Sequence, residues 1–599
     1  MTSHHPAFLL KVGLSALVFC LSAARGQAPM PGSVGVSPML TKWVDPLPVP
    51  PAATPRIVPV LSAFADYYEI AMTEHAHQFH SELGPATVWT YGLLGQPGVY
   101  LGPTIVAKKG RPVIVKWFNL LPNNPDTFPL KASIDPTVMG SDLPTGRAIP
   151  HLHGGKTAAR FDGTPGQWWT INGQKGMDYV SDTFTYTNDQ PAALLWYHDH
   201  SMGATRFNPY LGLAAGYLIF DQVDTGTTIN GQKVPSGNYH LPIVLQDKVF
   251  NADGTLFYPT SGNNAVHPVW VPEFFGDTPV INGKAFPRLD AEPRRYRLRF
   301  LNGSQARFYN LAFDNQGMLL PFHVIGSEQG LLPAPIQKTE LLIAPGERFD
   351  VIVDFSKLPL GAAITLKNNA PAPYPSGGMP DIPEMMQILV KTPVAAGNPD
   401  LSVPAAHLKL PAIPRLVPTH GLPDRELVGE ETEDPATSTP IVMKFNGYGS
   451  MDPTTDFVKA GTTETWDWIN LTMDAHPMHM HLVSFQVLNR QAFAVDGPNG
   501  YKAAWDAYLA SGRSPALKPI LSHYLTGPAL PPEPEEMGGK DTVKAYPGYV
   551  TRVRAKFELP WTSALDLNPK TKSFGSWVYH CHILEHEEND MMRPFEVVF

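Results

Sequence analysis

Proline is the residue that most limits how this chain can fold. The 599 residues include 63 prolines and 50 glycines, and proline is present at about twice its usual frequency of ~5%. Because proline interrupts the interior of a helix, long helices are disfavoured and short strands joined by turns are favoured. Runs such as 113–118 and 348–355 are rich in strand-forming residues, and 501–511 is the best helical candidate. The sequence therefore predicts an all-β protein made of antiparallel sandwiches.

A weak threefold repeat indicates more than one sandwich. Strand-like runs end on asparagine at Asn119, Asn302 and Asn470. Three copies in about 570 residues give about 190 residues each, a reasonable domain size. A segment at 491–540 is expected to be a surface insertion in the third copy. The predicted organisation has a signal peptide at 1–28, an extended arm at 29–56, and three domains at 57–230, 231–395 and 396–599.

The first residues are typical of an export signal. Lys11 precedes a short apolar stretch, and 26–28 read Gly-Gln-Ala, a small-x-small cleavage site. The stretch is too short for a typical membrane span, and no other segment is long and apolar enough. We therefore expect cleavage after Ala28 and a secreted or periplasmic protein whose mature chain has no membrane span. An uncleaved anchor is the alternative. Cleavage removes Cys20 and leaves Cys581 as the one cysteine.

Charge and cysteine content exclude several classes of protein. The formal net charge is 45 − 54 = −9, and no basic block is present, so nucleic acid is not an expected partner. Two cysteines are too few for a disulfide scaffold or a zinc ribbon.

The histidines gather in four clusters, of which the last is the most informative. In an extended segment, His580 and His582 face one way and Cys581 faces the other, so one short peptide can serve two metal sites. Cys581, His586 and Met591 follow at intervals of five residues. One thiolate, two imidazoles and a weak axial thioether form a blue-copper electron-transfer site. The second imidazole is expected from His476.

The other side chains of these clusters predict a second centre. Four His-x-His pairs supply eight imidazoles, namely His151, His153, His198, His200, His479, His481, His580 and His582. Eight imidazoles without cysteine fit a group of copper ions better than zinc, calcium or an iron–sulfur cluster. A one-electron site joined to such a group suggests a multi-electron acceptor, of which dioxygen is the obvious one. His75, His77 and His80 have similar spacing but no second set to complete a site, so we do not expect them to bind metal.

The four clusters resemble the copper-binding motifs of the multicopper oxidases, in particular the spore-coat laccase and bilirubin oxidase branch. The similarity extends from about Tyr67 to Phe599. It is carried by His151-Leu152-His153-Gly154-Gly155, Trp196-Tyr197-His198-Asp199-His200, His476-Pro477-Met478-His479-Met480-His481 and His580-Cys581-His582-Ile583-Leu584-Glu585-His586 with Met591 beyond it. The resemblance implies three cupredoxin-like Greek-key β-sandwich domains, with one copper in the third domain and a trinuclear copper cluster between the first and third.

The resemblance also implies a role for each residue and a total of four copper ions. Type 1 copper would be bound by His476, Cys581, His586 and Met591. Type 2 copper would be bound by His151 and His479, and the type 3 pair by His153, His198, His200, His481, His580 and His582. Asp162 and Glu587 match the acids that handle protons beside the cluster. Unlike some relatives in this branch, the cleaved chain cannot form a disulfide.

The implied function is a laccase-like oxidase, expected to be a monomer. It would oxidise small phenols and aromatic amines, with bilirubin as a further candidate, one electron at a time, and reduce dioxygen to water. Electrons are expected to enter at an exposed edge of His586. A cuprous or manganous oxidase of the same family is the alternative. The dispersed methionines, with only Met537 in 491–540, count against cuprous ion. Manganese would need an acidic cluster near His586, and this possibility is left open by Glu585, Glu587, Glu588 and Asp590. A non-enzymatic copper-binding structural protein is less favoured, because no ligand is missing.

Overall fold

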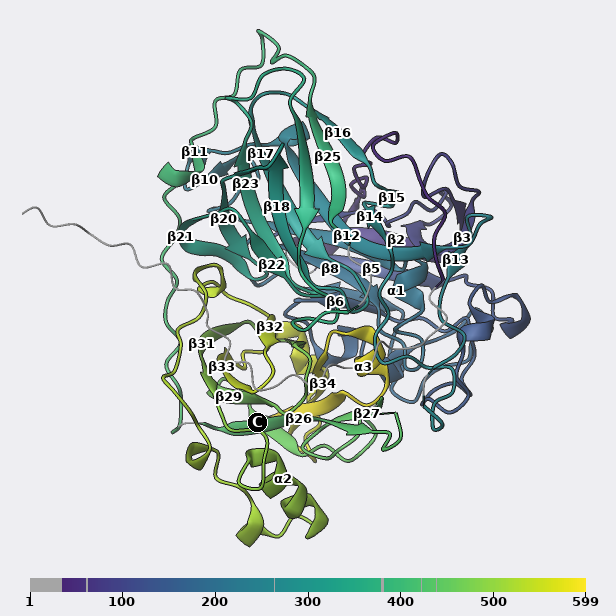
Figure 1. The fold of residues 1–599 in the computed structure, drawn as a ribbon, viewed down its shortest axis with the longest axis vertical. Coiled ribbons are helices and arrows are strands. Elements are labelled where there is room, and N and C mark those ends of the chain that lie inside the picture. Colours follow the sequence, from purple (N-terminus) through teal and green to yellow (C-terminus); the bar gives the residue numbers. More distant parts are fainter. Residues whose placement is uncertain (1–34, 61–62, 263, 379–381, 422, 438) are drawn as a thin grey trace, which may run out of the picture. The chain divides into compact units, whose positions relative to one another are not determined.

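The computed structural model describes residues 35–599 apart from 61–62, 263, 379–381, 422 and 438. The expected signal peptide at 1–28 lies outside the described residues. Strands dominate the described part of the chain (Figure 1). Its α-helices are α1 (Asn208–Leu211), α2 (Tyr501–Ala510) and α3 (Leu584–Glu588), so the helix expected at 501–511 is confirmed. None of the described helices has the length and apolar character that a membrane crossing needs.

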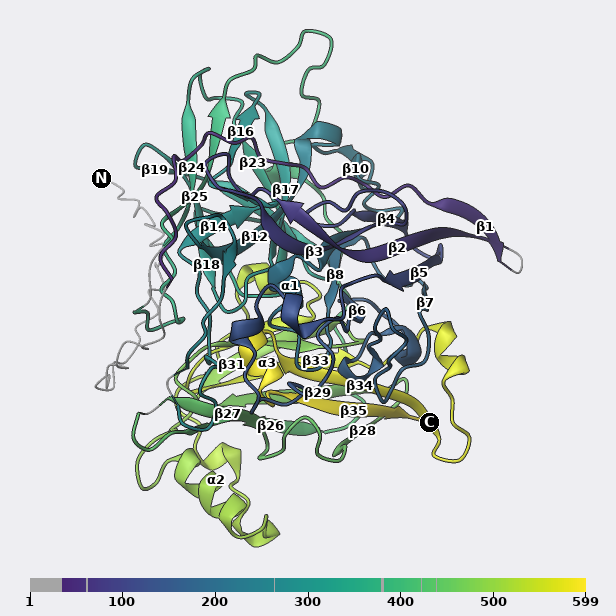
Figure 2. The ribbon, with the colours of Figure 1, turned by 90° about the vertical axis from the view of Figure 1, so that its right-hand side faces the viewer.

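The first pair of sheets spans residues 56–220. One sheet has the order β1-β2-β5-β7, with β3 also paired to β2, and the other has the order β4-β9-β8-β6. The first two strands form a long hairpin (Figure 2). The strands are β1 (Arg56–Val60), β2 (Ala63–His77), β3 (Ala86–Leu93), β4 (Ile105–Lys108), β5 (Val113–Asn119), β6 (Pro150–His153), β7 (Thr183–Tyr186), β8 (Ala193–Asp199) and β9 (Ala214–Phe220).

The second pair of sheets follows a small hairpin of β10 (Thr228–Ile229) and β11 (Gln232–Lys233). One sheet has the order β15-β14-β12-β17-β23-β20-β21, with β13 on β12, and the other has the order β16-β25-β24-β18-β19, with β22 on β18. The strands are β12 (His240–Phe250), β13 (Leu256–Phe257), β14 (Thr278–Ile281), β15 (Lys284–Ala285), β16 (Arg288–Ala291), β17 (Arg295–Asn302), β18 (Tyr309–Asn315), β19 (Met318–Leu320), β20 (Phe322–Ser327), β21 (Gly330–Lys338), β22 (Leu341–Ile343), β23 (Arg348–Asp354), β24 (Ala363–Asn368) and β25 (Glu384–Val390).

The third pair of sheets spans residues 425–598. Its sheets have the orders β27-β26-β29-β33-β31 and β28-β35-β34-β30-β32. The strands are β26 (Arg425–Glu433), β27 (Pro440–Phe445), β28 (Asp456–Lys459), β29 (Thr463–Asn470), β30 (His476–Met480), β31 (Phe485–Ala492), β32 (Thr542–Ala545), β33 (Tyr549–Lys556), β34 (Ser573–Cys581) and β35 (Met592–Val598).

Each pair of sheets encloses a buried aromatic core. Trp117 lies in the first core, Phe349 in the second and Trp466 in the third. Each pair also contains parallel neighbours that are far apart in sequence: β2 with β5, β12 with β17, and β26 with β29. Parallel neighbours of this kind arise when a chain crosses from one sheet to the other, as in Greek-key sandwiches. The prediction of an all-β fold with three cupredoxin-like sandwiches is confirmed, while the exact domain boundaries stay predictions.

The threefold sequence repeat corresponds to a repeated hydrogen-bond pattern. Asn119, Asn302 and Asn470 end β5, β17 and β29. Each is buried, and its Nδ2 donates to two backbone carbonyls while its Oδ1 accepts from the backbone N–H two residues later. For Asn470 the two carbonyls are those of Asp474 and Ala545. This asparagine therefore ties the turn before β30 to the end of β32.

The segment at 491–540 packs against the third sandwich. It contains α2 and the 3₁₀ turns η7 (Pro515–Leu517), η8 (Leu521–His523) and η9 (Pro534–Glu536). Tyr501 and Trp505 of α2 join Phe493 and Val550 in a separate buried cluster. The indole Nε1 of Trp505 donates to Glu430 of β26 at 2.8 Å. The insertion is thus anchored by its own apolar cluster.

We predict that Asn302→Ala destabilises the fold by about 2–4 kcal/mol, because three hydrogen bonds are lost and two buried carbonyls and an N–H lose their partner. Calorimetry of the copper-free protein should show a clear fall in the unfolding temperature. Asn310→Ala is the control, since its amide bonds Asn369 at an exposed position, and a change of no more than about 0.5 kcal/mol is expected there. Equal effects of the two substitutions would contradict the structural role of the repeat.

Candidate metal centres

Two antiparallel strand pairs bring the histidine clusters together. β6 pairs with β8, so that His151 lies opposite His198, and β30 pairs with β34, so that His479 lies opposite His580. Side chains two residues apart share a face of a strand, whereas those an odd number apart lie on opposite faces. His476 and His479 therefore point to opposite sides of β30, and Cys581 and His580 point to opposite sides of β34. These two strands can each serve two sites.

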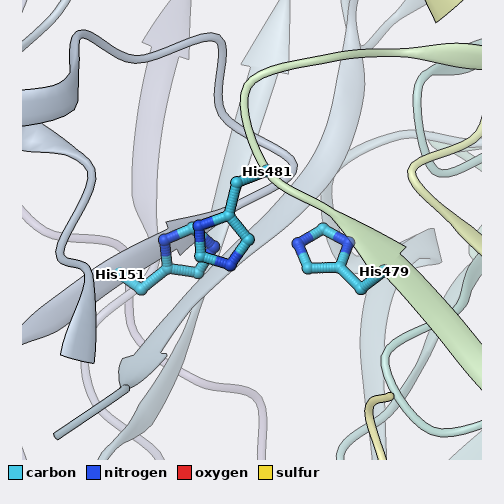
Figure 3. Close-up of side chains that lie close together, drawn as sticks. All are labelled: His151, His479 and His481. Carbon is cyan, nitrogen blue, oxygen red and sulfur yellow. The ribbon is translucent and has the colours of Figure 1, made fainter. Parts of the chain in front are cut away.

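Eight buried histidines form the larger centre. Their nitrogen atoms converge in three groups in which all the donor atoms lie within 4.8 Å of one another: His153, His198 and His582; His200, His481 and His580; and His151, His479 and His481. His481 Nε2 and His200 Nε2 lie 3.2 and 3.4 Å from His580 Nε2. The rings of His151 and His481 stack, with their centroids 3.8 Å apart, and His479 faces them from the same strand segment as His481 (Figure 3). All eight histidines predicted for this centre meet.

The donor atoms of this centre fit metal ligation. The Nδ1 atoms of His151, His198 and His479 bond backbone carbonyls at 2.6, 3.0 and 2.8 Å. Their Nε2 atoms are buried and have no hydrogen-bond partner among the described residues. A metal-ligating histidine commonly bonds a carbonyl or carboxylate through the nitrogen that does not bind the metal. Each ring is therefore oriented with one free nitrogen toward the centre.

A second, smaller site lies on the opposite face of β30 and β34. Cys581 Sγ lies 3.5 Å from His476 Nδ1 and 3.8 Å from His586 Nδ1, and the two Nδ1 atoms lie 3.2 Å apart. Donor atoms that surround one first-row metal ion at about 2.0–2.3 Å must lie about 3–4 Å from each other. Met591 is fully buried in the same apolar cluster as Cys581. The predicted thiolate and two imidazoles therefore meet with the spacing that one ion requires.

Burial sets the protonation state of the histidines. It lowers the pKa of His476 and of His198 to about 3. Burial, and then the neighbouring rings of His481 and His200, also lower the pKa of His151 well below its ordinary value. A neutral imidazole is the form that binds metals. The fold therefore keeps these side chains in their ligating form at neutral pH.

Both predicted acids lie beside the larger centre. Asp162 is buried, its Oδ2 lies 2.6 Å from His481 Nδ1, and its Oδ1 accepts from Thr157. Burial raises the pKa of Asp162 to about 8. Glu587 on α3 lies 3.0 Å from His580 Nδ1 and 3.3 Å from His200 Nδ1. Each acid is thus placed against a histidine of the centre.

Sequence reasoning missed Asp541. Its carboxylate lies 3.1 Å from His153 Nε2, its backbone carbonyl bonds His479 Nδ1, and Arg348 donates to it through both terminal nitrogens at 2.7 and 2.6 Å. Gly154 borders this pair, because a Cβ there would lie 2.4 Å from Asp541 Oδ2. Asp541 follows the 491–540 insertion and has no histidine near it in sequence. The sequence around Asp541 therefore gives no indication that its carboxylate lies beside the histidines.

Thr472 is the second residue that sequence reasoning missed. Its hydroxyl lies 2.6 Å from His476 Nε2. This hydrogen bond orients the imidazole so that its other nitrogen, Nδ1, lies beside the Cys581 sulfur. Thr472 belongs to the turn that Asn470 anchors.

The early histidines at 75, 77 and 80 lie apart from both centres. His77 bonds the Gly283 carbonyl, and neither His75 nor His80 belongs to a group of converging donor atoms among the described residues. The expectation that this early cluster is no metal site stays a prediction.

The exposed edge expected for His586 is not found. The residue is 1% exposed, and its Nε2 is buried without a hydrogen-bond partner among the described residues. A segment between β13 and β14 reaches its neighbour Glu585: the Tyr258 hydroxyl donates to the Glu585 carboxylate and the Trp270 indole to its backbone carbonyl. The expectation failed because these contacts join residues more than 300 positions apart.

Comparisons with known proteins agree with this arrangement. The family described as "Multicopper oxidase" matches residues 431–598. A laccase of Bacillus subtilis (strain 168) is 37% identical over 563 residues, covering 93% of this chain and 99% of that protein. The multicopper oxidase LPR1 of Arabidopsis thaliana is 34% identical, covering 88% of each chain. The crystal structure of the multicopper oxidase McoA of Aquifex aeolicus has a TM-score of 0.66 at 23% identity, covering 94% of this chain and all of that one.

We predict that Asp541→Asn weakens metal binding at the eight-histidine centre about 10–100-fold, the usual effect of losing a carboxylate that orients a ligating histidine. Copper per chain after dialysis against graded chelator concentrations measures this. Asp350→Asn is the matched control, because Asp350 also pairs with a buried arginine, Arg297, but touches no histidine of the centre. Both variants should unfold at lower temperature, but only Asp541→Asn should release copper. Equal copper retention in the two would contradict the role of Asp541.

Proposed function

We infer that this chain, because it belongs to the multicopper oxidase family, is a copper-dependent oxidase of the laccase type. Such an enzyme oxidises a reducing substrate and uses dioxygen as the acceptor. The observation that carries this function is the convergence of eight buried histidines on one side of β30 and β34 and of the Cys581 site on the other. A complete set of donors also argues against a purely structural copper-binding protein.

We propose four copper ions for these donors. The smaller site would hold one ion through His476, Cys581 and His586, with Met591 as the axial thioether. Two of the three histidine groups, which together contain His153, His198, His200, His481, His580 and His582, would hold a pair of ions. His151 and His479 would hold the fourth. When bound, copper supplies one-electron transfer at the thiolate site and four-electron reduction of dioxygen at the histidine site.

Cys581 is the proposed electron path between the two sites. It lies between His580 and His582 in sequence, and all three side chains are buried. A few covalent bonds therefore lead from the Cys581 sulfur to either imidazole of the larger centre. Thr472 and the backbone contacts of α3 hold the two imidazoles beside the sulfur, so the donor geometry need not change when an electron passes.

Asp162 and Glu587 are the proposed proton carriers. The reduction of one dioxygen to two waters takes up four protons, which must reach a centre that is buried from solvent. Asp162 holds its carboxylate against His481, and Glu587 holds its carboxylate between His580 and His200. Each acid can pass a proton into the centre without a change in fold. Their contacts with these three histidines are the support for this role.

Small phenols and aromatic amines are the proposed organic substrates, with bilirubin as a further one. Because the His586 ring is buried, we expect such substrates to dock on the surface near it without touching the ring. We also propose a monomeric, secreted or periplasmic enzyme with domains at 57–230, 231–395 and 396–599.

Oxygen uptake by the purified, copper-loaded protein tests the proposed function. The reductants to compare are a phenol, bilirubin, Cu(I) and Mn(II), and the absence of uptake with all four would refute the function.

We predict that Cys581→Ser abolishes both the blue colour and turnover, because the copper–thiolate bond produces the absorption at about 600 nm. Circular dichroism should show the fold retained, since serine is nearly isosteric. Met592→Leu is the control: its side chain is the immediate neighbour of the proposed axial Met591, and colour should persist. A blue, active Cys581→Ser protein would contradict the site assignment.

We predict that Glu587→Gln slows reoxidation of the reduced enzyme by dioxygen at least about 10-fold, within the usual contribution of a positioned proton donor, while the blue colour is retained. Stopped-flow mixing of reduced protein with dioxygen measures this step. Glu588→Gln is the matched control on the same helix, because Glu588 pairs with Arg206 and lies outside the histidine centre. Equal reoxidation rates in the two variants would remove Glu587 from the mechanism.

A further inference from the structure

Methionines that are dispersed in the sequence gather in one cleft between the first and third sandwiches. The cleft has a volume of about 670 Å³, and its lining comes from segments within 159–202 and 450–594. Its methionines are Met177, Met202, Met451 and Met592. The sulfur of a fifth, Met139, accepts a hydrogen bond from the hydroxyl of Ser450, which also lines the cleft, at 3.7 Å.

A high methionine content is not a general property of the clefts of this protein. A second cleft, of about 580 Å³, is lined by residues of all three sandwiches, including Gly154, Gln329 and Val483. No methionine is found among the described residues that line it. The concentration of thioethers is therefore specific to the cleft between the first and third sandwiches, which we call the methionine cleft.

The thioethers of the methionine cleft extend from the surface inward. Met177 and Met451 are 73% and 53% exposed. Met202 is half-buried, and Met592 is buried beside the proposed axial ligand Met591. Thioether sulfur is a common target of oxidants, which convert it to the sulfoxide. The two exposed methionines are therefore the first sulfur atoms that an oxidant in the cleft would meet.

The walls of the methionine cleft also carry parts of the larger candidate centre. The backbone N–H of His481 donates to the carbonyl of Val578, which lines the cleft. Gln167 also lines it, and the hydrogen bonds of its side-chain amide hold the turn that contains Asp162. Met202 is two residues beyond a histidine of the centre. The cleft therefore adjoins the centre on the side of Asp162.

Incomplete reduction of dioxygen supplies an oxidant for these sulfur atoms. Four electrons and four protons convert one dioxygen to two waters, whereas two electrons and two protons convert it to hydrogen peroxide. Electrons reach the proposed centre one at a time, so a shortage of reducing substrate favours the two-electron product. Hydrogen peroxide is small and uncharged, and it can diffuse through a cleft of this volume.

We propose that the methionine cleft consumes hydrogen peroxide released at the larger centre, with Met177 and Met451 as the residues that react first. The proposal rests on the oxidase function inferred above. In each reaction the O–O bond of the peroxide breaks, one oxygen atom bonds to the thioether sulfur, and the other leaves as water. The sulfur loses two electrons and the peroxide gains them. Sulfoxide reductases restore the thioether, and the deeper Met592 is spared.

Turnover under isotopically labelled dioxygen tests the proposal on the unaltered, copper-loaded full chain. A phenol is the reductant, at a limiting concentration, and catalase removes peroxide that reaches the bulk solution. Peptide mass spectrometry then measures labelled sulfoxide at each methionine. Met177 and Met451 should carry several-fold more label than Met318 and Met537, which are 58% and 52% exposed but do not line the methionine cleft.

A double substitution is the second test. Met177→Leu combined with Met451→Leu nearly conserves side-chain volume, so the initial kcat, the KM and the blue colour should be unchanged. The number of turnovers before inactivation should fall several-fold, and labelled sulfoxide should appear at Met592 instead. Catalase should not restore the lifetime, because the peroxide reacts before it leaves the cleft. Met318→Leu combined with Met537→Leu is the matched control and should behave like the unaltered protein.

Two outcomes would overturn the proposal and leave the oxidase function standing. One is equal labelling of the cleft methionines and the two control methionines, which would mean that exposure alone decides oxidation. The other is an unchanged lifetime of the double variant of the cleft. The absence of oxygen uptake with the phenol would refute the phenol-oxidising function, and this proposal would fall with it.

Discussion

The pairing register of β30 and β34 is the constraint on which both candidate metal centres depend. His479 lies opposite His580, and Met478 lies opposite Cys581, so the two strands divide their donors between opposite faces. A slip of one residue would turn every donor of one strand to the wrong side. Because the two groups of donors share these strands, a few covalent bonds join them. The proposed electron path between them therefore follows a β-strand.

Residues outside the proposed ligand set hold this register. Asn470 ties the turn before β30 to the end of β32, and Asp541, the residue before β32, contacts two histidines of the larger centre. Asp541 is in turn held by Arg348 from the second sandwich. That sandwich contributes none of the proposed ligands, yet its arginine neutralises and orients the carboxylate that orients the ligands. The second sandwich therefore helps to shape the larger candidate centre, although it supplies none of the proposed ligands.

Local spacing predicted which histidines and which cysteine the fold brings together. His580, Cys581 and His582 alternate within three residues, and the period of two of a strand assigns them to faces without any knowledge of the fold. The same reasoning found the asparagine repeat and the helix in the insertion. It did not find the burial of His586, the contact of Trp270 with Glu585 or the contact of Asp541 with His153, because those contacts join residues separated by hundreds of positions. Nothing in the local pattern distinguishes them from other buried side chains.

The sequence by itself determined the chemistry: which atoms are available as ligands, how many, and on which face of a strand each lies. Only the tertiary structure decided what can reach them. The contacts of Tyr258 and Trp270 with Glu585, and of Asp541 with His153 and Arg348, join separate segments and result from the packing of one part of the chain on another. The physical reason is that ligand type depends on covalent structure and local backbone period, whereas access and electrostatic environment depend on contacts between distant parts of the chain.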